Sequence, residues 1–305
     1  MTNRPAEWST ALARIIAFVN DKGGVGKTSN VANLGGQLAA AGYRVLAVDL
    51  NRQANLSDDF GIRDTESDDQ GSGLLAALQD GTPLKPVTVR PNLDLAPGGT
   101  RLHRLTSFVV SEMSHQGMAV YNILAAALAP VAPEYDIVLV DCPPENVIAT
   151  DLALAAARWV VMPTRSDHGG LTGMKLTAER FAVARQSNPE LGLLGVVLFG
   201  TLKGATAIHT EVQKDVAEAF GGQSPMFEAV IRHSERVARD CRRLGKLAHE
   251  LEVEATQQPQ WWKALREGAK GPRLSSTTAS VSADYRALAA ELLQVLAAAE
   301  KGGQS

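Results

Sequence analysis

The residues best suited to chemistry form one glycine- and lysine-rich run near the N-terminus. It comprises Asn20, Asp21, Lys22, Gly23, Gly24, Val25, Gly26, Lys27, Thr28 and Ser29. Glycines let the backbone curl so that successive N–H groups point inward and bind phosphate oxygens. Lys27 would reach the β- and γ-phosphates of a nucleotide, and the Thr28 hydroxyl would be a ligand of Mg²⁺. The run therefore predicts a site for a nucleoside polyphosphate.

The run departs from the usual phosphate-loop pattern, G-x-x-x-x-G-K-[ST], at its first position. That pattern requires glycine at position 21, where this chain has Asp21, and a second lysine, Lys22, comes next. A dinucleotide fingerprint, G-x-G-x-x-G, does not fit, because Lys27 and Thr28 interrupt its spacing. The alternative is a glycine-rich turn with incidental lysines. The position of the run between an expected strand and an expected helix favours the phosphate site.

The elements that must position this loop alternate along the chain. Strands separated by helix-length segments imply right-handed crossovers and parallel strands covered on both faces. We therefore expect an α/β fold: a mainly parallel twisted sheet with helices on both faces. The expected strands are 15–20, 44–49, 92–96, 137–141, 159–163 and 192–200, and the expected helices are 28–41, 102–129, 150–157, 171–186 and 210–220.

Composition narrows the class of protein. Of 305 residues, 45% are hydrophobic and 21% are charged, which excludes a fibrous or wholly disordered chain. The net charge of −3 means that any nucleic-acid site must be a local basic patch. The longest apolar runs are far shorter than the roughly 18 residues that cross a bilayer. Cys142 and Cys241 stand apart in the sequence, as expected in a reducing cytoplasm.

Four segments are expected along the chain. Residues 1–13 form an N-terminal extension, and 14–256 form the phosphate-loop domain. Prolines, glycines and a Ser/Thr cluster break the pattern at 257–282, which predicts an insertion or a flexible connection. Within it, Trp261 and Trp262 either stack on nucleic acid or pin the segment to the core. Residues 283–305 are expected to form a final helix that packs on the domain.

Several motifs resemble those of the ParA/MinD family of ATPases. The run from Lys22 to Thr28 resembles the family's deviant Walker A motif. Residues 48–56 are similar to its first switch, written D-x-D-P-Q-x-N, and residues 135–144 to its Walker B strand and second switch. Residues 283–288 resemble the terminal helix of ParA-type DNA partition proteins. The resemblance covers about residues 14–250 and 283–300.

The resemblance implies a role for each matching residue. Lys22 would contact the nucleotide of the other subunit in an ATP-sandwich homodimer. Thr28 would coordinate Mg²⁺, and Asp49 and Asp141 would hold it through water. The catalytic set would be Lys22, Lys27, Asp49 and Asn51. The residues implied in binding ATP are Lys22, Gly23, Gly24, Val25, Gly26, Lys27, Thr28, Ser29 and Pro163.

One departure concerns hydrolysis. The family's second switch-1 acid, thought to position the attacking water, is Asn51 here, and the usual proline is Arg52. A carboxamide cannot take a proton, although it can orient water. We therefore expect slow hydrolysis. Arg52 either stabilises charge on the γ-phosphate or is an exposed switch residue.

A second basic cluster lies near the C-terminal part of the domain. Its spacing of i, i+4, i+7 and i+11 predicts one face of a helix. Such a face suits contact with DNA phosphates without base reading, and it resembles the region where partition ATPases bind DNA. The alternative is a solvated helix face. The expected DNA-binding residues are Arg232, Arg236, Arg239, Arg242, Arg243 and Lys246.

These features together predict a DNA-partition ATPase. ATP would drive dimerisation, the dimer would bind nonspecific double-stranded DNA, and a ParB-like centromere-binding protein would trigger release. Such a protein would lie in the cytoplasm, on the nucleoid. One alternative is a hydrolysis-poor scaffold or regulator. Another is a MinD-like membrane-associated ATPase, but the terminal helix has acidic residues and only Lys301 near its end, so no stable membrane association is expected.

Overall fold

A single sheet organises the part of the chain that the structure describes. The computed structural model describes residues 5–201, 206–222, 224–257 and 277–302. Its strand order is β3-β4-β2-β5-β1-β6-β7-β8, and all neighbouring strands are parallel except β3 and β4 at one edge. The expected fold class is therefore confirmed. The strands are β1 (Ile15–Phe18), β2 (Val45–Asp49), β3 (Val87–Arg90), β4 (Leu93–Ala96), β5 (Ile137–Asp141), β6 (Trp159–Thr164), β7 (Gly192–Thr201) and β8 (Ile231–Arg232).

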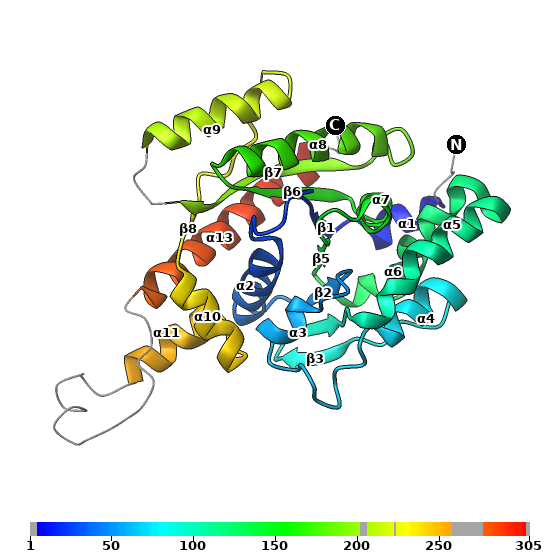
Figure 1. Cartoon of the computed structure of the whole chain (residues 1–305), viewed down its shortest axis with the longest axis horizontal. Helices are drawn as coiled ribbons and strands as arrows, with labels where there is room; N and C mark the ends of the chain where they lie inside the picture. The colour runs from blue at the N-terminus through cyan, green and yellow to red at the C-terminus, as the bar shows by residue number, and fades with distance from the viewer. Residues whose placement is uncertain (1–4, 202–205, 223, 258–276, 303–305) are drawn as a thin grey trace.

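Helices cover both faces of this sheet. Figure 1 shows α2 and α13 on one side of the central strands, with α6 and α7 on the other. The helices are α1 (Ala6–Ala11), α2 (Lys27–Ala40), α3 (Asn55–Asp59), α4 (Ser72–Asp80), η1 (Thr100–Arg104), α5 (Leu105–Gln116), η2 (Gly117–Asn122), α6 (Ile123–Leu128), η3 (Ala132–Glu134), α7 (Val147–Ala156), α8 (His168–Ala184), α9 (Thr206–Ala219), α10 (Glu235–Leu244), α11 (Ala248–Gln257) and α13 (Thr278–Gly302).

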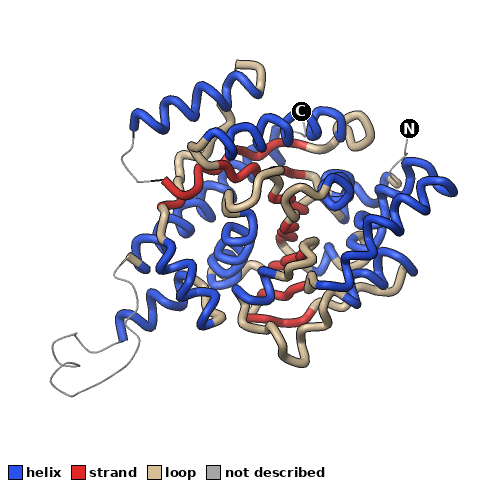
Figure 2. The backbone as a smooth tube through the Cα atoms, viewed as in Figure 1, coloured by secondary structure: helices blue, strands red, loops and turns tan. Residues whose placement is uncertain are grey.

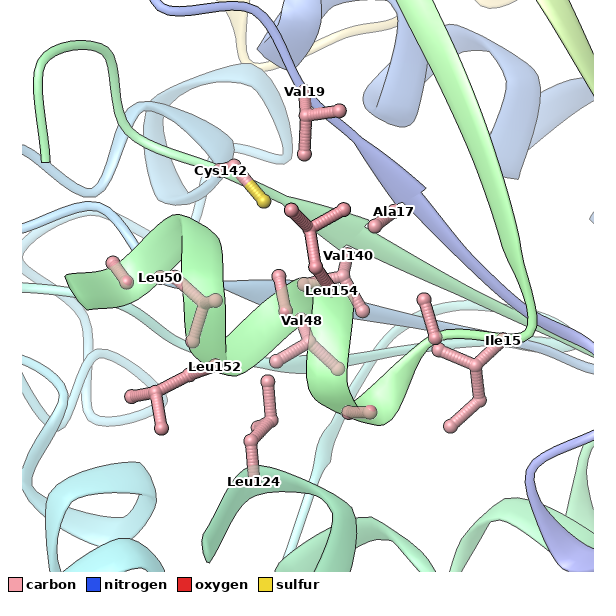
Figure 3. Close-up of a cluster of buried hydrophobic side chains, with 14 of the residues drawn as sticks. Ile15, Ala17, Val19, Val48, Leu50, Leu124, Val140, Cys142, Leu152 and Leu154 are labelled. Carbon is pink, nitrogen blue, oxygen red and sulfur yellow. The ribbon is translucent and has the colours of Figure 1, made fainter. Parts of the chain in front are cut away.

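Alternate residues of each central strand enter different cores. In β1, Ile15 and Ala17 pack with α5 to α9, while Ile16 and Phe18 pack with α2, α10, α11 and α13. The first of these cores is drawn in Figure 3, where Leu152 and Leu154 of α7 lie over the strands. Figure 2 shows the strands as a layer between the two sets of helices. Burial on both faces explains why these strands read as continuous apolar runs.

The terminal helix belongs to the second core. Leu288, Leu292 and Leu296 of α13 are buried against the sheet and its covering helices. The helix begins at Thr278 rather than at the expected residue 283. Of the expected insertion at 257–282, residues 258–276, with Trp261 and Trp262, lie outside the described residues. Among the described residues, no helix is long and apolar enough to cross a membrane.

Side-chain caps explain why two helices begin earlier than expected. The Asn146 side chain accepts a hydrogen bond from the backbone N–H of Ala149, so α7 begins at Val147 rather than at residue 150. The Asp167 carboxylate accepts from the backbone N–H of Gly170, so α8 begins at His168 rather than at residue 171. Both caps satisfy N–H groups that a helix leaves unpaired in its first turn.

A close backbone contact joins the segment after β2 to α10. Gly245, the C-cap of α10, has φ of +60°, and a β-carbon built on it would lie 2.4 Å from the Cα of Gly61. Gly61 follows Phe60, the C-cap of α3. The Arg90 guanidinium bridges the same place, because it donates to the carbonyls of Phe60 (3.1 Å) and Gly245 (2.7 Å). These contacts join the two segments directly.

Replacing Gly245 with alanine should lower the free energy of unfolding for two reasons, the left-handed backbone at this position and the close contact with Gly61. Gly81 offers a matched control, since it caps α4 with φ of +66° and a β-carbon there would meet nothing within 4 Å. Gly81→Ala should lower the free energy of unfolding by about 1–2 kcal/mol, the cost of the left-handed backbone. Gly245→Ala should lower it by about 1–3 kcal/mol more, because of the clash with Gly61. Urea denaturation measures both values, and equal losses would contradict the close contact.

Candidate functional site

The glycine-rich run forms a loop between β1 and α2, as its sequence predicts. Gly24 and Gly26 have positive φ, +75° and +91°, which favours glycine. A β-carbon on Gly26 would lie 2.4 Å from Cδ2 of Phe199, so the ring of this β7 residue lies directly against the loop. Val25 is buried and anchors the loop in the fold. The backbone is thus curled at the N-terminus of a 14-residue helix, where anions bind.

The Lys27 ammonium is held inside this loop. Its Nζ donates to the carbonyl oxygens of Asn20 (2.8 Å) and Lys22 (2.9 Å), and only 6% of the residue is exposed. Burial lowers the pKa of Lys27, and the nearby Asp141 carboxylate opposes this effect. A phosphate would relieve the cost of burying this ammonium, since charge-assisted hydrogen bonds are stronger than those to neutral carbonyls.

Two carboxylates and a hydroxyl meet beside the loop. Asp49 and Asp141 end β2 and β5 in register. The Thr28 hydroxyl donates to Oδ2 of Asp141 at 2.6 Å. Oδ2 of Asp49 accepts from the backbone N–H of Leu56 at 3.3 Å. Burial raises the pKa of Asp141 to about 7, and burial together with the Asp141 charge raises the pKa of Asp49 well above its usual value. Two buried carboxylates repel each other when both are charged, and a cation bound between them would stabilise their charged forms.

The chemistry of this corner fits Mg²⁺. Oδ1 of Asp141 is buried and has no hydrogen-bond partner among the described residues, which is the state expected of a metal-facing oxygen. Nowhere in the described ranges do three or more His, Cys, Asp or Glu side chains gather to hold a metal on their own. Mg²⁺ typically takes one or two carboxylates and completes its octahedron with water and substrate phosphates. Thr28, Asp49 and Asp141 would supply the protein's share of such a ligand set.

Asn51 lies in the loop that follows Asp49. Its side-chain Oδ1 accepts from the backbone N–H of Gln53 (2.9 Å), and its own N–H donates to Oδ1 of Asp49 (2.8 Å). Sequence reasoning missed Gly98, which packs under this loop: a β-carbon there would lie 2.8 Å from Cγ of Asp49 and 2.6 Å from the Asn51 carbonyl. The available signal was the Gly98-Gly99 pair directly after the strand at 93–96.

The segment after β5 also contacts the phosphate loop. Pro144 packs near Gly23, with 3.8 Å between its Cγ and a β-carbon built there. The backbone N–H of Glu145 donates to the carbonyl of Asp21 at 3.1 Å. Cys142 is buried, and burial raises the pKa of its thiol, so it is an inert packing residue rather than a nucleophile. The segment after β5 thus touches the loop that would hold the phosphates.

Lys22 differs from Lys27 because it is exposed. Its backbone N–H donates to Oδ1 of Asn20 (2.9 Å), and its side chain runs along the start of α8, where a β-carbon on Gly169 would lie 3.2 Å from its Cε. Pro163 is buried on β6, and its carbonyl accepts from the Asn20 amide at 2.8 Å. Asn20 therefore ties the loop to β6, a role that sequence reasoning missed.

A cavity of about 420 Å³ begins at the phosphate loop and reaches α10 and α13. This volume is in the range of sites for nucleotide-sized ligands. Its lining includes Ser29, Asn51, Arg165, Phe199, Arg242 and Tyr285, together with Gly23, Gly24, Gly26, Lys27 and Thr28. The expected nucleotide- and metal-site residues that do not line this cavity are Lys22, Val25, Asp49, Asp141 and Pro163.

The expected basic helix is present in part. The placement of Arg232 on it is wrong: Arg232 lies on β8 and makes a two-pronged ion pair with the buried Asp284, at 2.6 and 2.8 Å. The helix begins only at Glu235, because the Ser234 side chain caps it by accepting from the N–H of Val237. Val237 and Cys241 are buried and dock α10 on the domain.

The four arginines of α10 are all exposed to solvent. Arg236 and Arg239 are exposed to solvent, three residues apart on one face. Arg242 pairs with the buried Asp59 of α3 at 3.4 Å, and Arg243 pairs with Asp240 at 3.2 Å. After the helix, Lys246 pairs with Glu254. All four arginines are more than a third exposed. The ion pairs therefore fix the positions of Arg242 and Arg243 and leave their side chains accessible to solvent.

Comparisons with known proteins agree with this geometry. The family described as AAA domain matches residues 13–193. The chain is 35% identical over 233 residues to the chromosome partitioning protein ParA of Caulobacter vibrioides, covering 74% of this chain and 82% of that protein. A structure of McdA from Cyanothece in complex with ATP has a TM-score of 0.65 at 21% identity, covering 85% of this chain and 98% of that one.

A structure with both nucleotide and metal has the same fold. Cobyrinic acid a,c-diamide synthase from Mycobacterium smegmatis, with bound ATP analog and magnesium, has a TM-score of 0.62 at 24% identity, covering 86% of this chain and 99% of that one. The relationship to ParA extends over most of both chains, and the phosphate loop, both switch-like segments and the parallel sheet accompany it. This chain therefore belongs to the ParA/MinD family of P-loop ATPases.

Proposed function

We propose that this protein is a DNA-partition ATPase that dimerises on ATP and Mg²⁺. In the ATP state it binds nonspecific double-stranded DNA, and with a ParB-like centromere-binding partner it segregates plasmid or chromosomal DNA. The observation that carries the proposal is the direct contact between the nucleotide site and the exposed basic helix α10. The similarity to ParA of Caulobacter vibrioides supports the same function.

Two sets of groups in this chain would hold the phosphates of a nucleotide: one set binds the phosphate oxygens, and the other holds the Mg²⁺ ion. The Lys27 ammonium and the loop N–H groups neutralise the polyphosphate, and Thr28, Asp49 and Asp141 hold Mg²⁺ between them. Mg²⁺ bound there would supply positive charge beside the phosphates. Lys22, exposed beside α8, is free to extend across an interface to the phosphates of a second subunit. If the Lys22 ammonium of each chain pairs with the phosphates bound to the other chain, bound ATP joins the two subunits, and the dimer requires ATP.

A structural change at the nucleotide site would be transmitted to α10 through α3. Asp59 ends α3 and lies in the cavity wall, and its ion pair with Arg242 joins this wall to α10. Burial raises the pKa of Asp59 to about 6, so its charge is retained near neutral pH and must be balanced. The contact between Gly61 and Gly245 adds a rigid connection. A shift of the Asn51 segment toward a γ-phosphate would therefore move α10 as well.

The exposed face of α10 fits DNA phosphates rather than bases. Arg236 and Arg239 present two guanidinium groups on one face, and the exposed part of the helix carries no aromatic side chain that would stack on bases. Arginine pairs well with phosphate because its N–H groups form a planar fork. With a net charge of −3, the chain attracts DNA through this local surface and not through a global field. Binding should therefore be sequence-independent and salt-sensitive.

A second candidate function, that of a scaffold or regulator with little hydrolysis, is favoured by one residue, Asn51. Its carboxamide stands where a carboxylate would accept a proton, so hydrolysis should be slow. If turnover is too slow to cycle, the same ATP-dependent dimer would act as a scaffold or regulator that positions a protein cargo. The two functions share the nucleotide site and differ in whether a partner stimulates phosphate release.

Lys22→Ala should abolish the ATP-dependent dimer while each protomer still binds nucleotide. Lys22 contributes its charge across the interface, whereas Lys27 holds the phosphates within the chain. Size-exclusion chromatography with light scattering in a non-hydrolysable ATP analogue measures the dimer, and Lys175→Ala on the exposed face of α8 is the control. A Lys22→Ala protein that dimerises like the wild type would contradict the assignment.

Asn51→Asp should raise the rate of phosphate release by about tenfold or more, because a carboxylate can accept a proton where a carboxamide cannot. Single-turnover release of phosphate from Mg²⁺-ATP gives the rate. Asn92→Asp, a change of the same chemistry at an exposed turn after β3, controls for the added charge. No gain at position 51 would show that this residue does not sit at the attacking water.

The double variant Arg236→Glu, Arg239→Glu should bind DNA at least about tenfold more weakly in the ATP state, with a shallower dependence of affinity on salt. Fluorescence anisotropy with random-sequence duplex DNA measures both. Arg101→Glu, Arg104→Glu reverses two exposed charges on η1 and should leave retention unchanged. If both double variants lose binding equally, the loss reflects net charge and α10 is not the DNA surface.

A further inference from the structure

Asn20 is a buried polar side chain beside the phosphate loop. Only 3% of the residue is exposed, and its side chain does not line the nucleotide cavity. An amide buried in this way costs free energy unless its donors and its acceptor are paired. Asn20 lies two residues before Lys22, so the partners of its amide can hold the backbone that leads into that lysine.

The Asn20 amide joins the loop to a strand and a helix. Its Oδ1 accepts the backbone N–H of Lys22 at 2.9 Å, in the short turn that asparagine forms with the residue two positions later. Its Nδ2 donates to the carbonyl of Pro163 on β6 at 2.8 Å and, in a longer bond, to the carbonyl of Gly170 on α8 at 3.5 Å. α8 itself packs on β6 (Figure 1). The amide therefore fixes the position of the Lys22 backbone relative to both elements.

The other backbone groups at the base of Lys22 are also paired. The N–H of Asp21 donates to Oγ1 of Thr177 on α8 at 3.1 Å, and its carbonyl accepts from the N–H of Glu145 at 3.1 Å. The carbonyl of Lys22 accepts from the Lys27 ammonium at 2.9 Å. With the bond to the asparagine amide, every backbone N–H and carbonyl of residues 21 and 22 has a partner. The base of the Lys22 side chain is therefore fixed, while its exposed stem and ammonium remain able to move.

α8 approaches this amide closely because it has glycine at the point of contact. A β-carbon built on Gly173 would lie 2.4 Å from Oδ1 of Asn20 and 2.9 Å from the backbone nitrogen of Lys22. Glycine inside a helix lowers its stability relative to alanine. The close approach is thus made at a position where any larger residue would displace the amide from Lys22.

Asn20 contacts the two lysines of the loop through different groups. The Lys27 ammonium donates to the backbone carbonyls of Asn20 (2.8 Å) and Lys22 (2.9 Å). A phosphate would compete for this ammonium, since charge-assisted hydrogen bonds are stronger than those to neutral carbonyls. The side-chain amide of Asn20 takes no part in these bonds. It would therefore remain bonded to the Lys22 backbone when the Lys27 ammonium turns to a phosphate.

We propose that Asn20 is a positioning residue for Lys22. Its amide fixes the backbone from which the Lys22 ammonium reaches the nucleotide bound to a second subunit. Lys27 uses only the backbone carbonyl of Asn20, which any residue at this position would provide. The inference rests on the proposed function for the role of Lys22. Loss of the amide should impair ATP-dependent dimerisation and spare nucleotide binding by the single chain.

A purely structural role for Asn20 predicts a different result. An amide that only stabilised the loop would, when removed, lower nucleotide affinity and dimerisation together. Asn188 offers a matched control, because it is 2% exposed and its amide donates to the carbonyls of Leu154 (2.9 Å) and Ala157 (2.8 Å). It thereby ties the segment after α8 to α7, at the end of the helix away from Lys22. Its removal tests what the loss of a buried amide does by itself.

The experiment measures dimerisation and nucleotide binding separately in the full chain. Sedimentation velocity with Mg²⁺ and a non-hydrolysable ATP analogue gives the dissociation constant of the dimer. Titration of a fluorescent ATP analogue at protein concentrations below that constant gives the nucleotide affinity of the single chain. Asn20→Ala should raise the dissociation constant of the dimer about tenfold or more and change nucleotide affinity less than about threefold. Asn188→Ala should lower the thermal unfolding midpoint and leave both binding constants unchanged.

Two further variants test the contact itself. Asn20→Ser should weaken the dimer less than Asn20→Ala, because a hydroxyl can accept the Lys22 N–H in the same kind of turn. Gly173→Ala keeps the asparagine but displaces its amide, so it should also weaken the dimer, whereas Thr172→Ala on the exposed side of the same helical turn should not. Gly173→Ala also serves if Asn20→Ala does not fold, since alanine favours a helix more than glycine does.

The wild type and Lys22→Ala separate this proposal from the function on which it rests. If the wild type does not dimerise with the analogue, or Lys22→Ala dimerises equally well, the proposed function fails, and the role of Asn20 fails with it. If these two proteins behave as expected but Asn20→Ala and Gly173→Ala dimerise like the wild type, only the positioning role is overturned. Equal losses of nucleotide affinity and dimerisation in Asn20→Ala would overturn it as well, because the amide would then support the whole loop.

Discussion

Buried charge at the carboxyl ends of neighbouring parallel strands constrains this whole structure. Asp49 and Asp141 end adjacent strands in register, and the Lys27 ammonium is enclosed a short distance away by the loop after β1. Burial works against the charged form of all three groups, as the raised pKa of the carboxyls and the lowered pKa of the lysine show. A polyphosphate bound with a divalent cation would stabilise the charged forms of all three groups. The fold therefore favours a charged ligand at this corner.

Two structural routes lead away from that corner to opposite faces of the sheet. On one face, Asp59 and Gly61 connect the segment after β2 to the basic helix α10. On the other, the backbone of Asp21 is bound by Thr177 of α8. Each route consists of a few short contacts between rigid elements, which is the arrangement that transmits a small shift.

Much of the fold could be predicted because local patterns were unambiguous. The strand expected at 137–141 coincides with β5. Its four apolar residues are followed by the acidic Asp141, which marks the end of the strand in the sequence. Helix starts were less accurate where a polar cap lies outside the apolar pattern, as at Asn146 and Asp167. Arg232 was placed on a helix by its spacing alone, but its ion pair with Asp284, distant in the sequence, holds it on a strand.

The amino-acid sequence by itself determined the phosphate loop, the two acidic strand ends and the class of fold, because glycine conformation, charge and hydrophobic periodicity act over a few neighbouring residues. Only the tertiary structure decided which groups meet across the chain. The packing of Gly98 under Asp49, the pairing of Asp59 with Arg242 and the hydrogen bond from Asn20 to Pro163 each join segments far apart in sequence. These contacts form because the sheet brings distant elements together and their side chains pack closely. A local sequence pattern contains no information about such packing.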